Sequence, residues 1–247
     1  MCAIVGYVGG RSALEVVVAG LERLTGRVYD SAGVAILSDG GLATAKKAGP
    51  LERLAEELRR RPLPSGPTGV GHIRRATLGG ADDTNAHPQL DNAGRVAVVH
   101  DGMIDNHAAL RAELAGRGHA FASDTDTEVV AHLLAESYSS CGDLTEAMRQ
   151  VHGRLEGAYA VVAVAADEPD TLVAACRDAL LVVGVGEGEY FVASDAAAFA
   201  DQTRSVIEPG RDRVVEVRRD AVLVLDPDGV PVAVRPYELG LPAAGPG

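Results

Sequence analysis

Residues 1–10 read MCAIVGYVGG, so a cysteine directly follows the first methionine of the chain. The uncharged run at residues 3–8 predicts a buried strand. If the methionine is removed, Cys2 carries a free α-amine, a group that titrates at about 7.7–8.0 in model compounds and can take the proton of the thiol. A cysteine also occurs at a second position by chance, so the rest of the chain has to decide whether this one is a nucleophile.

Composition describes an ordinary globular protein. The chain has 247 residues, of which 47% are hydrophobic and 23% are charged, and it is long enough to bury a substantial core. We expect one domain over residues 1–240 and a flexible tail over residues 241–247, whose sequence LPAAGPG has linker composition. The net charge of −12, with lysine and arginine scattered among acids, argues against a nucleic-acid partner.

The apolar runs are too short to span a membrane, and the N-terminus lacks a signal peptide, so we expect a cytoplasmic protein with no membrane partner. The three cysteines, Cys2, Cys141 and Cys176, are odd in number and widely spaced, which argues against a disulfide framework or a zinc site. The histidines also lack metal-ligand spacing, and we expect His72, His87 and His100 to be structural. No metal and no cofactor is predicted.

The pattern of apolar residues predicts an α+β layout with much antiparallel sheet. The first half alternates strands with amphipathic helices. We expect strands at residues 33–37 and 95–100, and helices at residues 11–24 and 144–155. Thr125 and Glu128 resemble a capping box that opens a further helix. From residue 158 onward, short β-type runs are separated by turns, and the turn at residues 226–229 predicts a hairpin with a strand over residues 230–234.

Five motifs follow the cysteine in a fixed order. They are RVYDSAG at 27–33, GHIRRATLGG at 71–80, NAHP at 85–88, VVHDGMIDN at 98–106 and SDTDTEV at 123–129. Together they resemble the class II glutamine amidotransferases, and specifically the glutaminase domain of glucosamine-6-phosphate synthase, over nearly the whole chain. This resemblance implies the four-layer αββα sandwich of the N-terminal nucleophile hydrolases.

The resemblance also implies roles for individual residues. Cys2 is the expected nucleophile, Arg27 orders its surroundings, and the N–H of Gly102 donates to the oxyanion. A free amino acid needs a cation for its α-carboxylate and an anion for its α-ammonium. The positions that match these binders are Arg74 and Thr77 for the carboxylate, and Asp126 with the carbonyl of Gly102 for the ammonium.

Several positions depart from the family pattern. Asp101 stands where the family has an asparagine that donates to the oxyanion, and losing one such donor lowers the rate by about 10²–10³. An ionised Asp101 would place a negative charge beside a developing one, and only a protonated Asp101 donates as the amide does. In the loop at residues 74–78, Arg75 and Leu78 replace a tryptophan and a histidine, and Ala3 replaces the glycine that follows the nucleophile.

Three hypotheses therefore remain open. In the first, the chain is a stand-alone glutaminase subunit that cleaves glutamine through a γ-glutamyl thioester on Cys2 and passes ammonia to a separate synthase. In the second, Cys2 serves another amide as a repurposed hydrolase or an acyl or amide transferase, and Asp101 orients an incoming amine. In the third, the chain is a catalytically impaired binding subunit that kept the fold.

Overall fold

The structure is a computed structural model that describes residues 2–25, 29–39 and 41–240. Arg27 and the tail expected over residues 241–247 lie outside the described residues. Among the described residues, no helix is both long enough and apolar enough to cross a membrane.

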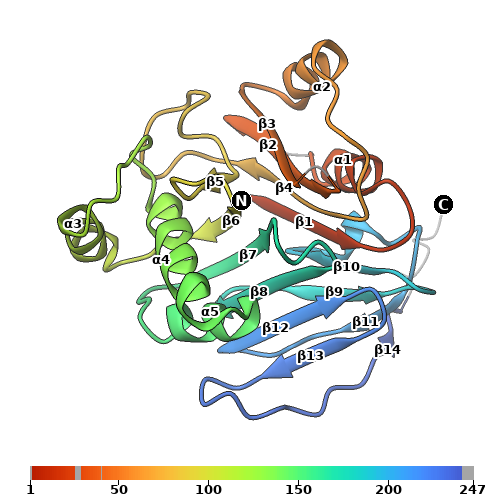
Figure 1. Ribbon diagram of the computed structural model, residues 1–247. Coiled ribbons are helices and arrows are strands. Elements are labelled where there is room, and N and C mark those ends of the chain that lie inside the picture. The colour runs from red at the N-terminus through yellow and green to blue at the C-terminus, as the bar shows by residue number, and fades with distance from the viewer. Residues whose placement is uncertain (1, 26–28, 40, 241–247) are drawn as a thin grey trace.

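Two antiparallel sheets form the centre of the molecule (Figure 1). The strands of the eight-stranded sheet are, in spatial order, β14 (Tyr237–Glu238), β11 (Ser205–Ile207), β9 (Val182–Val185), β10 (Tyr190–Ala193), β1 (Ala3–Val8), β4 (Thr68–Arg74), β2 (Ser31–Ser38) and β3 (Gly41–Ala48). Those of the six-stranded sheet are β13 (Val222–Leu225), β12 (Arg213–Arg218), β8 (Thr171–Arg177), β7 (Tyr159–Ala165), β6 (Val96–Gly102) and β5 (Gln89–Leu90).

Helices cover the outer faces of both sheets. Figure 1 shows α1 and α2 against the eight-stranded sheet and α4 and α5 against the six-stranded sheet. The helices are α1 (Ala13–Arg23), α2 (Leu51–Arg60), α3 (His107–Gly116), α4 (Asp126–Cys141) and α5 (Leu144–His152), with a 3₁₀ turn, η1, at Ala196–Ala198. The architecture is thus the predicted four-layer αββα sandwich.

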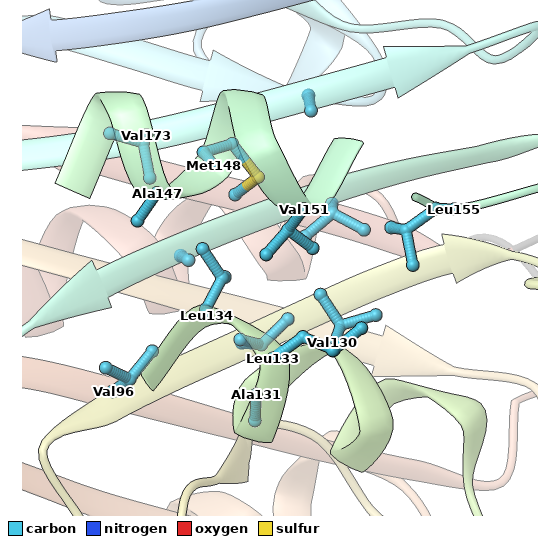
Figure 2. Close-up of a cluster of buried hydrophobic side chains, with 14 of the residues drawn as sticks. Val96, Val130, Ala131, Leu133, Leu134, Ala147, Met148, Val151, Leu155 and Val173 are labelled. Atoms are coloured by element: carbon cyan, nitrogen blue, oxygen red, sulfur yellow. The ribbon is translucent and has the colours of Figure 1, made fainter. Parts of the chain in front are cut away.

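Buried apolar clusters fill the spaces between the layers. Figure 2 shows one of them, where Leu134 of α4 and Met148 of α5 pack toward Val173 of the six-stranded sheet. Strand β7 contributes side chains to two buried clusters: Val161 packs in the cluster against these helices, whereas Val162 packs in the cluster between the two sheets. A strand buried on both faces reads as a continuous apolar run, and its side chains still alternate in direction.

Most predicted elements are present, with small shifts at their ends. The strand expected at residues 3–8 is β1, and the helix expected at 11–24 is α1. The helix expected at 144–155 ends earlier, at His152, and Gly153 follows it.

Two local predictions are wrong. Thr125 and Glu128 do not form a capping box, because the Thr125 hydroxyl lies 2.8 Å from Ser123 Oγ while Glu128 accepts the backbone N–H groups of Ala122 and Ser123. The turn at residues 226–229 forms, but the strand expected over residues 230–234 is reduced to a single bridge between Leu225 and Pro231. Two hydrogen bonds flank this bridge, from the N–H of Asp226 to the carbonyl of Val230 at 3.0 Å and from the N–H of Val232 to the carbonyl of Val224 at 2.8 Å.

Candidate active site

A cavity of about 390 Å³ lies where the N-terminal end of β1 meets the C-terminal ends of β4 and β6. It brings together six of the seven predicted site residues, which are Cys2, Arg74, Thr77, Asp101, Gly102 and Asp126. The seventh, Arg27, is among the residues not described. The cavity also contains residues for which the sequence predicted a structural role or none, namely Arg75, His87, His100, Met103 and Ala158.

Cys2 lies directly before β1, and strand pairing places it beside the end of β4. Ala3 pairs with Ile73, so the next residues outward in this antiparallel register are Cys2 and Arg74. The backbone N–H of Arg75 donates to Cys2 Sγ at 3.3 Å. Burial raises the pKa of the Cys2 thiol to about 11, and the negative charge of Asp101 adds to this shift. The sulfur therefore holds its proton at neutral pH and needs a base before it can attack.

Asp101 and Gly102 end strand β6, where they pair with Ala160 and Tyr159 of β7. Gly102 has a φ of +119°, and a Cβ atom built there would lie 2.2 Å from the carbonyl oxygen of Ala158. Only glycine fits this backbone and this close approach. The end of β6 therefore has the peptide group of Gly102, without a side chain, at the wall of the cavity next to Asp101.

Arg74 ends strand β4 and is only 3% exposed. Its guanidinium donates to the carbonyls of Leu78 and Gly80, which bends the loop around the side chain. Burial lowers the pKa of Arg74, and the nearby Cys2 and Asp126 oppose that shift. The guanidinium of Arg74 is therefore held in the cavity wall as a cation that can bind an anionic group.

Asp126 is the first residue of α4 and is 4% exposed. Its Oδ2 accepts the backbone N–H of Ile104 at 3.0 Å, and its Oδ1 lies 3.6 Å from Nδ1 of His100. The N-terminus of a helix favours a negative charge. The cavity therefore presents a buried carboxylate as well as the buried Arg74.

Three buried histidines are joined by hydrogen bonds at the cavity, and two of them, His87 and His100, line it. Nδ1 atoms of His72 and His87 lie 2.9 Å apart, and Thr127 Oγ1 lies 2.9 Å from His87 Nε2 and 3.1 Å from His100 Nδ1. Burial lowers the pKa of all three imidazoles, so they are neutral. In the part of the chain that the structure describes, no three His, Cys, Asp or Glu side chains are grouped to hold a metal ion.

The sequence contained one usable signal for the histidines. Each lies within one of the five ordered motifs, His72 in GHIRRATLGG, His87 in NAHP and His100 in VVHDGMIDN. Their hydrogen bonds, however, join residues far apart in the chain, and no spacing rule predicts which imidazole faces which.

A cysteine at the start of an inner strand of an αββα sandwich, facing a cavity with a buried cation and a buried anion, defines the N-terminal nucleophile type of hydrolase fold. A family model described as "Glutamine amidotransferase domain" matches residues 73–201. The chain belongs to the class II glutamine amidotransferases, a class of enzymes.

Individual relatives agree with this assignment. The chain is 66% identical over 239 residues to the glutamine–fructose-6-phosphate aminotransferase (isomerizing) of Streptomyces coelicolor, a match that covers 97% of this chain and 39% of that protein. It therefore spans about two fifths of the length of the curated relatives it matches.

Solved structures share the fold. The glutamine phosphoribosylpyrophosphate amidotransferase of B. subtilis, complexed with ADP and GMP, superposes with a TM-score of 0.77 at 24% identity, over 92% of this chain and 49% of that one. A structure titled as the allosteric regulatory enzyme of purine biosynthesis gives a TM-score of 0.79 at 26% identity, with the same two coverages of 92% and 49%.

Proposed function

We propose that Cys2 cleaves the side-chain amide of glutamine through a γ-glutamyl thioester, and that the ammonia passes to a synthase on a separate subunit. The observation that carries this proposal is the placement of Cys2 in one cavity with the buried cation Arg74 and the buried anion Asp126. These two opposite charges match the α-carboxylate and the α-ammonium of a free amino acid.

Binding by these charges orients the substrate for attack. With Arg74 and Thr77 on the carboxylate, and Asp126 with the Gly102 carbonyl on the ammonium, the side-chain amide extends toward the sulfur. Removal of the first methionine would give Cys2 the free α-amine that takes the thiol proton. The sulfur then bonds to the amide carbon, the carbon–nitrogen bond breaks, ammonia leaves with that proton, and water resolves the thioester.

The oxyanion that forms during this attack needs hydrogen-bond donors. The backbone N–H of Gly102 is one proposed donor, and Asp101 contributes a second only in its protonated form. Arg27 is proposed to order the surroundings of the nucleophile.

Two further parts of the proposal concern the protein as a whole. Residues 1–240 are proposed as one amidotransferase-type domain, because both sheets draw strands from both halves of the chain. A cytoplasmic location is supported by the free cysteines Cys2, Cys141 and Cys176, since free thiols suit a reducing compartment.

To test this function, the intact mass of the protein is measured before and after incubation with a diazoketone that mimics glutamine and alkylates such nucleophiles. We expect loss of the methionine mass and one adduct on Cys2, which Cys2→Ala abolishes while Cys141→Ala leaves it in place. A retained methionine would contradict the mechanism. A processed chain that stays unmodified would favour a changed substrate, as in the second hypothesis, or the binding subunit of the third.

One observation favours a second candidate, a repurposed amide hydrolase or acyl transferase. The Asp101 carboxylate lies close enough to the sulfur to raise the pKa of the thiol, which disfavours attack on glutamine but suits an incoming amine. Steady-state rates with glutamine and with substituted γ-glutamyl amides separate the two candidates.

A further inference from the structure

The cavity contains more charge than one glutamine can use. Its lining includes two arginines, Arg74 and Arg75, and two aspartates, Asp101 and Asp126. Within the described part of the chain, no ion pair joins these four groups to one another. Glutamine presents one carboxylate and one ammonium, which Arg74 and Asp126 satisfy. A second cation and a second anion therefore remain.

Burial separates the two pairs of charges. Arg74 and Asp126 are 3% and 4% exposed, whereas Asp101 is half-buried and Arg75 is exposed. Both residues of this outer pair line the cavity with Cys2: the backbone N–H of Arg75 donates to Cys2 Sγ at 3.3 Å, and the Asp101 carboxylate raises the pKa of the thiol. A glutamyl group held by the inner pair would thus have Arg75 and Asp101 on its solvent side.

We propose that the outer pair binds a second amino acid, and that this amino acid accepts the γ-glutamyl group from Cys2. Arg75 meets the carboxylate of the acceptor and Asp101 meets its amine. The proposal rests on the proposed function, because the γ-glutamyl thioester must form before it can be transferred.

The transfer step balances without any further reactant. The acceptor ammonium first gives one proton to water and binds to Asp101 as a neutral amine. Its nitrogen attacks the thioester carbon, the new carbon–nitrogen bond forms and the carbon–sulfur bond breaks. Asp101 takes the remaining surplus proton from the nitrogen and passes it to the Cys2 sulfur. The products are a γ-glutamyl amino acid and a regenerated thiol, ammonia having left in the first step.

The chemistry of Asp101 suits a step in which an amine has to lose a proton. A carboxylate beside the sulfur opposes the oxyanion in any attack on the thioester, but it accepts the proton that an attacking amine gives up. The residue that counts against a simple glutaminase therefore acts as the base for transfer.

The ratio of γ-glutamyl product to glutamate, measured by mass spectrometry, tests the proposal. The full chain, with Cys2 as its first residue, is incubated with glutamine and a panel of amino acids, each compared with its decarboxylated amine at equal free-base concentration. For glycine the matched amine is methylamine. For at least one amino acid, we expect a ratio of γ-glutamyl product to glutamate at least about tenfold higher than the ratio for its matched amine. Only the amino acid has a carboxylate that forms a charge-assisted pair with Arg75.

Substitutions test whether Arg75 causes the preference for amino acids over their amines. Arg75→Gln is expected to bring the two ratios together, whereas Arg61→Gln, which changes an exposed arginine at the end of α2, keeps them apart. If glutamate forms but no acceptor yields a γ-glutamyl product, or if the ratio ignores Arg75, the transfer proposal is overturned and the proposed function stands. If neither product forms and the diazoketone leaves Cys2 unmodified, the proposed function itself fails.

Discussion

The backbone N–H of Arg75 donates to the sulfur of Cys2 at 3.3 Å, although the two residues are 73 positions apart. The contact follows from the pairing of β1 with β4, which brings the first residue before one strand to the first residues after the other. Ala76 is tied down as well, through a 2.8 Å hydrogen bond from its N–H to Asp30. Cys2 is therefore positioned by the same loop that carries Arg75 and Thr77.

Replacing Asp101 by asparagine removes a negative charge beside Cys2 and supplies an amide donor. We expect Asp101→Asn to raise the rate of glutamine hydrolysis by about 10²-fold or more. It should also lower the pKa of the thiol from its value of about 11, so iodoacetamide should alkylate Cys2 at a lower pH. Transfer to amino acids should fall in the same variant. A lower rate of hydrolysis would show that Asp101 itself takes part in that reaction.

There is no room for an alanine side chain at position 102, because its Cβ would lie 2.2 Å from the carbonyl oxygen of Ala158. We expect Gly102→Ala to abolish alkylation of Cys2 by the diazoketone and to lower the free energy of unfolding by about 2 kcal/mol or more. Gly94→Ala is the matched control, because Gly94 also has a positive φ, of +66°, but its Cβ would meet nothing within 4 Å. Urea unfolding of both variants separates backbone strain from the clash, and equal losses would contradict the prediction.

The hydroxyl of Thr127 joins two buried histidines. Thr127→Val removes it and leaves His87 Nε2 and His100 Nδ1 without that partner, so we expect unfolding to become easier by about 2–4 kcal/mol. The KM for glutamine should also rise, because His100 Nδ1 lies 3.6 Å from Oδ1 of Asp126, the residue that we propose binds the ammonium. Thr127→Ser keeps the hydroxyl and should restore both quantities. If the serine variant behaves like the valine variant, the hydrogen bonds are not what matters.

Glu128 links stability to pH. Burial opposes its ionisation, but the nearby His132 and the N–H groups of Ala122 and Ser123 outweigh burial and hold the pKa of Glu128 at about 2, against an ordinary value of 4.5. Because the folded-state pKa is the lower one, this stabilisation is complete above pH 4.5 and is lost as the pH falls toward 2.

The contribution at neutral pH is about 3 kcal/mol. Urea unfolding at a series of pH values should therefore show a drop in this acidic range that Glu128→Gln flattens. The exposed Glu187→Gln should leave the drop unchanged, and a flat profile in the parent protein would disprove the assignment.

Several features of the fold were predictable from local pattern alone. The run AIVGYV reads as a buried strand and forms β1, and the apolar residues at three- and four-residue spacing form α1. Pattern failed where tertiary contacts decide the local geometry. Glu128 has capping-box spacing, yet its carboxylate accepts the N–H groups of Ala122 and Ser123 in the loop before α4, and the N–H of Ser123 is buried and needs a partner.

The candidate site divides in the same way. The ordered motifs predicted which residues to group, and the structure brings Cys2, Arg74, Thr77, Asp101, Gly102 and Asp126 together; their catalytic and binding roles stay predictions. The predictions did not include Arg75 as a second arginine in the lining of the cavity. Its position depends on strand register, and register is a property of two segments, not one.

The sequence by itself determined the class of this protein, because an N-terminal cysteine and five motifs in order leave little freedom in the fold that carries them. Periodicity alone predicted an α+β layout with much antiparallel sheet, and the four layers were what the resemblance implied. Only the tertiary structure decided that Arg74 and Asp126 are buried, while Asp101 is half-buried and Arg75 is exposed. The strength and use of a charge depend on its distance from other charges and from water, and those distances arise only when the two sheets pack together.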